Sequence, residues 1–285
     1  MLGQQLAYHL NQYRFLWTED SLSLFIWYYL FYALPYFTIA FAASAGLSYF
    51  FRGYRSRHKI RPISPTASQI VREIFYSMLT IAVFSLVGIY MFASARVHGT
   101  KVFYYHVAER GWWYLVFSLI VMIVLHDTYF YWTHRWMHLP YFFRRMHRTH
   151  HRSRVPTAWA AYELSPAEAL VQALFLPLFT WWFPIYWLVF LIFLVHMVFR
   201  VVQIHSGVEW MPRRVMDQPV FGLLTTTTHH DLHHRRMSGN YGLYFTWWDR
   251  LMGTELPDYR AEFLRYAGGS NSHEPLISGV KKQVA

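Results

Sequence analysis

The chain has 285 residues, of which 55% are hydrophobic, 21% aromatic and only 14% charged. Soluble globular proteins carry about 25% charged residues, so this composition favours a membrane protein over a water-soluble one. The absence of cysteine from the sequence excludes disulfides, thiolate zinc sites and cysteine-ligated iron–sulfur clusters.

Four apolar stretches predict the membrane-spanning part of the chain. Residues 22–51, 72–95 and 112–133 are each long enough to cross a bilayer, which takes about 20 residues. Residues 167–203 are apolar over nearly twice that length, and 181–184 interrupt them as the tip of a helical hairpin would. We therefore expect an all-α fold: a polytopic bundle of four to five membrane helices with a histidine-rich metal-binding cap.

The net charge of +11 is concentrated in two connecting segments. Residues 51–71 contain five Lys or Arg and no acid, and residues 134–165 contain six Arg against Glu163 alone. Basic loops lie preferentially on the cytoplasmic side, so we expect both segments, and the histidine-rich cap, on that side of the membrane. A chain this apolar has little soluble surface on which to form a basic groove for nucleic acid. We therefore do not expect nucleic acid as a partner.

Histidine is concentrated in three short boxes within or beside these segments. Their spacings are H-x3-H at 134–138 and H-x2-HH at 147–151 and 230–234. Residues three or four apart lie on one face of a helix, so one helical turn can present all the imidazoles of a box. Eight imidazoles exceed the four positions of one tetrahedral zinc, which favours two metal ions. The eight candidate ligands are His134, His138, His147, His150, His151, His230, His233 and His234.

Other polar residues near the boxes are candidates for supporting roles. His205, just after the last apolar stretch, is a candidate further ligand. Asp127, two helical turns before the first box, and His229 are expected to orient ligands through hydrogen bonds. His126 is expected to pack in the bundle or support the site, and His196 to be a hydrogen-bonded core histidine.

Each box on its own can be explained without a metal ion. The three boxes together also allow metal-dependent functions other than redox chemistry. An isolated H-x3-H pair can lie on a solvated helix face, and HRTHHR can be a basic patch attracted to anionic lipid. A zinc-dependent lipid hydrolase is disfavoured because HRWMH lacks the glutamate of the H-E-x-x-H motif. A histidine-rich metal transporter needs ionisable groups through the membrane, and the apolar stretches contain almost none. The ligand type alone favours iron over zinc only modestly.

The segments around the boxes resemble the sterol desaturase/fatty acid hydroxylase superfamily of membrane di-iron oxygenases. The resemblance lies in HDTYFYWTHRWMH (126–138), HRTHH (147–151) and HHDLHHRRMSGNYGLYFTWWDRLMGT (229–254), with HSGVEW (205–210) between the second and third boxes. It is closest to the sterol C4-methyl oxidase and C5-desaturase branches. The residues that match the closing segment, which we expect to be structural, are Asn240, Tyr241, Gly242, Trp248, Asp249 and Gly253.

The resemblance implies two ferrous ions held by the eight box histidines, dioxygen as co-substrate, and hydroxylation or desaturation of a sterol, fatty acyl or related apolar lipid. The chain shows no haem-binding extension like cytochrome b5 and no glycine-rich dinucleotide fingerprint. Electrons from NAD(P)H are therefore expected through a separate cytochrome b5-like or ferredoxin-like carrier, docked on the basic loops. We divide the chain into N-terminal membrane helices with a basic loop (1–111), a catalytic region (112–254) and a polar C-terminal tail (255–285).

Overall fold

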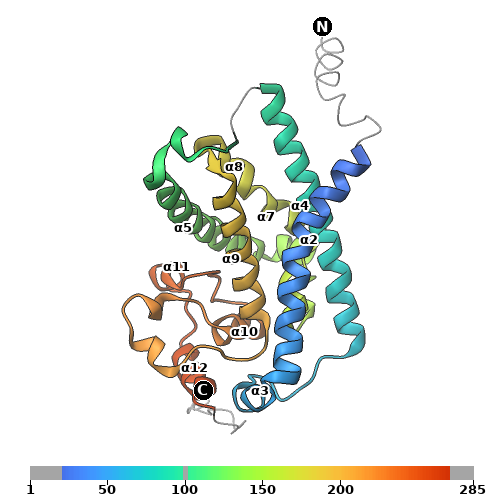
Figure 1. The fold of residues 1–285 in the computed structure, drawn as a ribbon. Coiled ribbons are helices and arrows are strands. Elements are labelled where there is room, and N and C mark those ends of the chain that lie inside the picture. Colours follow the sequence, from blue (N-terminus) through green and yellow to red (C-terminus); the bar gives the residue numbers. More distant parts are fainter. Residues whose placement is uncertain (1–20, 99–101, 270–285) are drawn as a thin grey trace.

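The computed structural model describes residues 21–98 and 102–269 and consists almost entirely of helices (Figure 1). Four of the described helices are long and apolar enough to cross a membrane. They are α2 (Ser21–Ala45), continued by a π-helical turn (Gly46–Phe50), α4 (Ala67–His98), α5 (Gly111–Met137) and α9 (Trp187–His205). They coincide with the predicted apolar stretches, so the all-α membrane bundle is confirmed, at the lower end of the expected four to five spans.

The last apolar stretch forms a helical hairpin whose first arm is broken. Two helices of 8 residues each, α7 (Pro166–Ala173) and α8 (Phe175–Trp182), take the place of a fifth membrane helix. Pro177 lacks an N–H, and its ring would collide with the carbonyl of Ala173 in a continuous helix. The helix is therefore interrupted between these two residues.

A short sheet lies at the tip of this hairpin. Strand β1 (Phe103–Tyr104) pairs in parallel with β2 (Ile185–Tyr186), and a 3-10 turn (Val107–Glu109) leads from β1 into α5. The sheet ties the connection between α4 and α5 to the start of α9.

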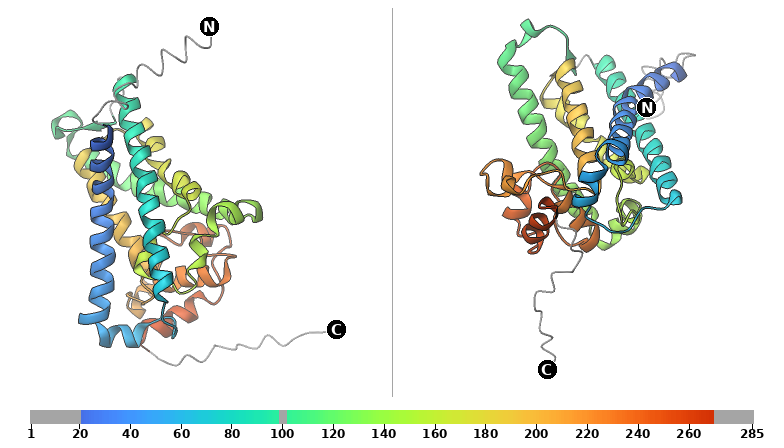
Figure 2. Two further views of the ribbon diagram at one scale, coloured as in Figure 1. Left: turned by 90° about the vertical axis from the view of Figure 1, so that its right-hand side faces the viewer. Right: turned by 60° about the horizontal axis from the view of Figure 1, so that its bottom comes forward.

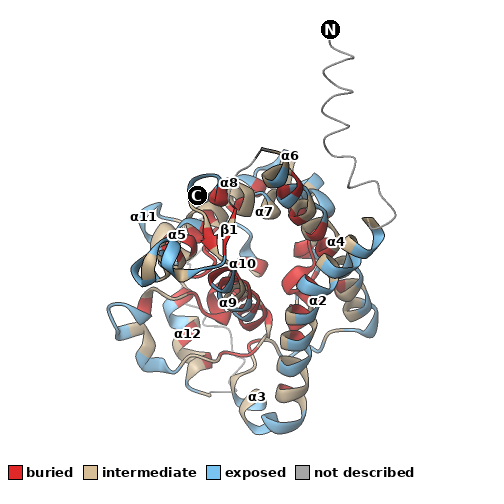
Figure 3. Ribbon diagram, turned by 45° about the horizontal axis from the view of Figure 1, so that its top comes forward, coloured by how far each residue is buried: buried red, intermediate tan, exposed pale blue. Residues whose placement is uncertain are grey.

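The bundle has a polar and aromatic interior and an apolar exterior. The fully buried Tyr36 stacks on Tyr162 with 4.5 Å between ring centroids, and its hydroxyl donates to the carbonyl oxygen of Trp159 at 2.7 Å. Figure 3 shows the buried residues on the sides of α2, α4 and α9 that face one another. Large apolar side chains such as Trp113 and Trp181 are exposed on the outside. Such a surface suits lipid rather than water, and the chain is an integral membrane protein.

The remaining elements form a cap at the end of the bundle where α3 lies (Figures 1 and 2). The helices of the cap are α3 (Arg52–His58), α6 (Pro140–Phe142), α10 (Thr227–Arg236), α11 (Trp247–Leu251) and α12 (Tyr259–Ala267). Its π-helical and 3-10 turns are Phe143–His147, His150–Arg152, Arg213–Asp217 and Phe221–Leu223. A further 3-10 turn, Ala158–Tyr162, packs inside the bundle against α2, α4 and α9.

Backbone hydrogen bonds join the first basic segment to the segment that follows α9. The N–H of Ile60 donates to the carbonyl of Gly207, and the N–H of Glu209 donates to the carbonyl of His58, both at 3.0 Å. Because the second basic segment contains two of the histidine boxes, both basic segments lie at the end of the bundle that carries the cap.

Helix α12 lies in the first part of the segment expected to be a polar tail. Its buried Tyr259 and Phe263 pack with Leu232 of α10, between the histidines of the third box. This part of the tail therefore belongs to the folded cap, while residues 270–285 lie outside the described part of the chain.

Candidate metal centre

The nine predicted histidine ligands lie together in two groups, and within each group the nearest ring nitrogens are all within 4.8 Å of one another. The five-histidine group consists of His134, His138, His147, His151 and His233. The four-histidine group consists of His150, His205, His230 and His234. All nine side chains are buried except that of His138, which is half-buried.

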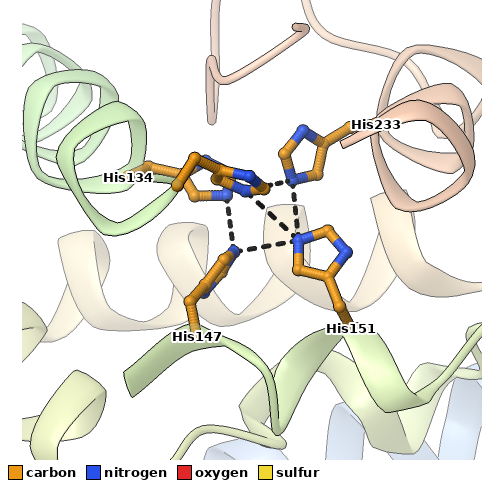
Figure 4. A group of neighbouring side chains, drawn as sticks. His134, His147, His151 and His233 are labelled. Atoms are coloured by element: carbon orange, nitrogen blue, oxygen red, sulfur yellow. Dashed lines mark hydrogen bonds between the residues drawn. The ribbon is translucent and has the colours of Figure 1, made fainter. Parts of the chain in front are cut away.

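Each group takes its histidines from several elements of the fold. In Figure 4, His134 from the end of α5, His147 and His151 from the second box and His233 from α10 turn toward one another. The third box lies on one helix, as expected, but His233 faces a different group from its two neighbours. The prediction that one helical turn presents the second box is wrong. A π-helical turn ends at His147 and a separate 3-10 turn begins at His150.

Distances between ring nitrogens match imidazoles that share a metal ion. In the five-histidine group, Nε2 of His147 lies 3.0 Å from Nε2 of both His134 and His151. In the four-histidine group, Nε2 of His230 lies 3.0 Å from that of His205 and 3.1 Å from that of His234. Two nitrogens bound to one ion at about 2.0–2.1 Å, with angles of about 90–109°, are about 2.8–3.4 Å apart.

The proton positions also fit a metal. Three histidines donate Nδ1–H to backbone carbonyls: His134 to Tyr241 at 2.9 Å, His233 to Gly239 at 2.8 Å and His205 to Val201 at 2.7 Å. A carbonyl only accepts, so in these neutral imidazoles Nδ1 carries the proton and Nε2 has only a lone pair. Lone pairs converging on one point repel each other, and a cation placed among them removes the repulsion.

Burial keeps the cap histidines in the form that binds metal. It lowers the pKa of His151 to about 3, and it lowers the pKa of His230, His233 and His234 well below the usual value, with neighbouring imidazoles adding to the effect. These side chains are therefore neutral at physiological pH, when histidine is a metal ligand. Nine close, neutral imidazoles form a donor set suited to two ions and leave coordination positions open.

Glu168 supports this site and was not identified from the sequence. Its Oε1 lies 2.7 Å from Nδ1 of His147, and its side chain is buried. A carboxylate in this position orients the ring and makes Nε2 a better ligand. The sequence signal was hidden because S-P-A-E is a typical helix start, and the Ser165 hydroxyl does accept from the Glu168 N–H at 3.2 Å.

We expect Glu168→Ala to weaken metal binding by about 10- to 100-fold, since loss of such a carboxylate releases the ligand ring. Glu168→Gln should weaken it less because the amide oxygen still accepts from Nδ1–H. Competition with a chelator, followed by metal analysis, measures the effect. Glu73→Gln, which changes a buried glutamate hydrogen-bonded to Ser153 and Thr157, serves as the control. Equal metal retention in Glu168→Ala and Glu73→Gln would contradict the role assigned to Glu168.

Known proteins are similar to this chain in the region that contains the histidine boxes. A family model described as fatty acid hydroxylase matches residues 119–254, which contain all nine histidines. A Delta(7)-sterol 5(6)-desaturase of Gibberella zeae is 31% identical over 219 residues, covering 75% of this chain and 64% of that protein. Lathosterol oxidase of Mus musculus is 28% identical over 189 residues, covering 66% and 61%. The region that carries the histidine boxes therefore matches the fatty acid hydroxylase family, and the chain is similar to a sterol desaturase over 75% of its length.

Further comparisons set the extent of this relationship. A probable Delta(7)-sterol 5(6)-desaturase of Neurospora crassa is 28% identical over 248 residues, covering 85% of this chain and 67% of that protein. The chain spans less than two thirds of the length of the Gibberella zeae and Mus musculus proteins. No solved structure matches it.

The two residues expected to orient ligands through hydrogen bonds, Asp127 and His229, make their contacts elsewhere. Asp127 accepts hydrogen bonds from the backbone N–H groups of Tyr244 and Phe245 at 2.7 and 3.2 Å, and from Trp247 Nε1 at 2.6 Å. It has no hydrogen bond to a histidine of either group. Asp127 therefore fixes the loop whose Tyr241 carbonyl accepts from His134, and its effect on the ligand is indirect.

His229 lies in the core of the cap beside the two groups. Its Nε2 is 3.5 Å from Oδ2 of Asp249, and its ring packs on Tyr259 with 4.9 Å between centroids. Among the described residues it has no hydrogen bond or ring contact with any of the nine histidines. His229 therefore does not orient a histidine ligand through a direct hydrogen bond, as we expected from the sequence.

Backbone geometry explains the residue types in the segment 240–253, which follows the third box. Asp249 accepts from the backbone N–H groups of Tyr241 and Gly242, both at 2.8 Å. A Cβ on Gly242 would lie 2.3 Å from the carbonyl oxygen of Phe245, so no larger residue fits without a shift of the backbone. Asn240 has a positive φ of 58°, a conformation that asparagine tolerates. These residues hold the loop that orients His134.

Proposed function

We propose that the chain is a membrane-bound di-iron oxygenase that uses dioxygen and external electrons to hydroxylate or desaturate a lipid. The observation that carries this proposal is the convergence of nine histidines, eight of them buried, into two groups at one end of a membrane bundle. The names of the similar proteins, desaturase and oxidase, support redox chemistry at such a site. The catalytic region is then 112–254, and the helices before it complete the bundle.

In this proposal the five-histidine group holds one iron ion and the four-histidine group holds the other. Bound iron would supply the redox chemistry by which dioxygen attacks an unactivated C–H bond. Glu168 keeps Nε2 of His147 directed at its group, and the carbonyls of Tyr241, Gly239 and Val201 do the same for three further ligands. The protein thereby fixes ligand geometry before the substrate binds.

The surroundings of the groups suit an apolar substrate. A cavity beside them is lined by His147, His150, His205 and His230 and by apolar residues such as Phe130. A lipid in this cavity would displace water and bring a C–H bond close to both groups. A metal transporter would instead need a polar path across the bundle, and the cavities along α9 are lined mostly by apolar side chains.

We further propose that a separate carrier, cytochrome b5-like or ferredoxin-like, delivers electrons from NAD(P)H at the cap. The exposed side chains of Arg144, Arg145, Arg148, Arg152 and Arg154 surround the second histidine box. Small electron carriers are commonly acidic, and complementary charge accelerates such encounters. This basic surface would bring the carrier close to the ligands of both groups.

The same charges predict that the cap and the metal site are cytoplasmic. Reporter fusions after residues 60 and 155 should therefore score on the cytoplasmic side, and a fusion at residue 103 should score on the opposite side. Both 60 and 155 lie at the cap end, and 103 lies at the sheet. A fusion at 155 that scores outside would place the site away from a cytoplasmic electron carrier and refute this orientation.

Lipid profiling tests the proposed reaction directly. A host that expresses the chain should contain lipids heavier by one oxygen atom or lighter by two hydrogen atoms than those of the host with an empty vector. These products should require dioxygen and should be missing when His230→Ala is expressed at the same level in the membrane. If neither class of product appears with the native chain, the proposed reaction is wrong.

A further inference from the structure

A cavity of about 160 Å³ lies at the border between the membrane helices and the cap. Its walls include three residues within 44–48, near the end of the first membrane span, and Ile70, near the start of the second. The segments 155–159 and 206–208 complete them. The cavity shares no lining residue with the cavity beside the two histidine groups, so a ligand here would bind apart from the metal centre.

Three cations line this cavity, and a single acid balances only part of their charge. Arg61 donates through Nε to Asp231 at 2.8 Å, and Asp231 also lies 3.0 Å from Nε of Arg235. Asp231 is the only acid among the lining residues, and two arginines already compensate its charge. The other two cations, Arg55 and Lys59, form no ion pair within the described part of the chain.

Arg55 and Lys59 lie close to each other at the end of α3, the short helix that follows the first membrane span (Figure 1). Arg55 makes one long hydrogen bond, 3.4 Å from Nη1 to the hydroxyl of Ser48, and the Lys59 ammonium makes none with any described residue. Burial and the nearby guanidinium of Arg55 lower the pKa of Lys59. Two like charges without a counterion repel each other, so an anion bound between them would be stabilising.

The size and the donors of the cavity fit a phosphate group. A cavity of about 150 Å³ can hold a molecule of the size of benzene, and a phosphate group is no larger. The guanidinium of Arg55 and the ammonium of Lys59 both pair well with phosphate oxygens. The hydroxyl groups of Ser44 and Ser48, which line the same cavity, can donate to further oxygens.

The position of the cavity favours a phosphate group that belongs to a lipid. Ile63 lines the cavity and is exposed, and Tyr49, Phe50 and Phe51 are exposed where the first membrane span ends. Exposed aromatic side chains mark the level at which lipid head groups lie, and basic pockets between membrane helices bind anionic head groups. Acyl chains would pack on these apolar side chains, whereas a water-soluble phosphate compound would gain nothing from them.

We propose that Arg55 and Lys59 bind the phosphate group of an anionic phospholipid whose acyl chains lie along the outside of the bundle beside α2. None of the nine histidines lines this cavity, so the bound phospholipid is distinct from the lipid that is oxidised. Its phosphate group would link the end of α2 to the segments that follow the second histidine box and His205. This inference goes beyond the proposed function, because the binding step needs neither metal nor dioxygen.

Binding of radiolabelled dioleoylphosphatidylglycerol to the full-length chain in an uncharged detergent tests the proposal. Unlabelled phosphatidylglycerol should compete about tenfold better than diolein, which lacks the phosphate group. It should also compete better than phosphatidylcholine, whose own cation neutralises its phosphate. Inorganic phosphate should compete only at far higher concentration, because it has no acyl chains to pack on the bundle.

Variants of the two unpaired cations locate the binding site. In Arg55→Gln and in Lys59→Gln the affinity for phosphatidylglycerol should fall about tenfold, because each change removes a charge-assisted hydrogen bond, while the affinity for diolein stays the same. Lys59→Arg keeps the charge and should bind nearly as well as the native chain. Arg52→Gln is the matched control: Arg52 lies on the same helix but is exposed and outside the cavity, so its loss should leave binding unchanged.

Three results would overturn the proposal: diolein or phosphatidylcholine that competes as well as phosphatidylglycerol, glutamine variants that bind like Arg52→Gln, or inorganic phosphate that competes as well as the lipid. The last result would identify a soluble anion as the ligand. Thermal unfolding without lipid shows whether each variant is folded, and the competition experiments use the native chain and need no variant. Because binding is measured without reductant or dioxygen, its outcome is independent of the oxygenase proposal.

Discussion

His151→Ala and His230→Ala should each abolish dioxygen-dependent lipid oxidation and lower the metal content from about two ions per chain to about one. In the five-histidine group, Nε2 of His151 is 3.0–3.2 Å from those of His138, His147 and His233, so its loss removes the ligand with most neighbours. His230 holds the corresponding position between His205 and His234. Metal analysis of the purified variants, together with product formation in membranes, measures both effects.

The matched control is His196→Ala. His196 lies in α9 but outside both groups; it packs on Tyr244 with 4.9 Å between ring centroids, and its buried Nδ1 has no hydrogen-bond partner among the described residues. The hydrogen bond predicted for His196 is therefore not made by Nδ1, and we expect replacement of the side chain to cost little stability. We expect two metal ions and measurable activity in His196→Ala. A correctly inserted His151→Ala protein with both metals and normal activity would refute the assignment of the five-histidine group.

The membrane helices could be predicted from the apolar stretches of the sequence because membrane insertion depends on local composition. A run of about 20 apolar residues is sufficient to predict α2, α4 and α5. The same rule overestimated the stretch that became α7 and α8, because Pro177 interrupts the helix while leaving the composition apolar. Composition therefore predicts which residues enter the bundle better than it predicts where a helix breaks.

The histidine boxes were visible as a spacing, but their division between two groups was not. His150 and His151 are neighbours in sequence yet belong to different groups, as His233 and His234 on the regular helix α10 do, because neighbouring side chains on a helix point in different directions. No local pattern in FRRMHRTHH predicts which group each side chain joins. That depends on contacts with α7 and α10, such as those of His147 with Glu168 and of His151 with His233, which are distant in sequence.

The supporting residues were the hardest part of the site to predict. Asp127 lies on the expected stripe of α5, but its carboxylate is satisfied by backbone N–H groups of a loop more than a hundred residues later. Glu168 was concealed by its place in a helix-capping pattern. Both cases need the tertiary fold, because hydrogen bonds between distant segments leave no periodic signal in the sequence.

Metal-free protein reconstituted with ferrous iron and an electron donor should regain dioxygen-dependent lipid oxidation, whereas protein reconstituted with zinc should not. The neutral imidazoles of both groups bind zinc well, and zinc stands above ferrous iron in the divalent affinity order. We therefore expect zinc in place of iron in purified material, but zinc has no redox chemistry with which to use dioxygen. Dioxygen uptake, lipid products and metal content measured on the same samples separate occupancy from activity.

The same experiment decides between the oxygenase and the zinc-dependent hydrolase. For the oxygenase, product should appear only with iron, reductant and dioxygen together, and each mole of oxidised lipid should consume dioxygen. Protein that binds zinc at both groups and stays inactive would agree with this, because nine clustered imidazoles provide ligands without choosing the metal. Turnover of lipid by the zinc-loaded chain in the absence of dioxygen would refute the oxygenase and leave hydrolysis as the reaction of this site.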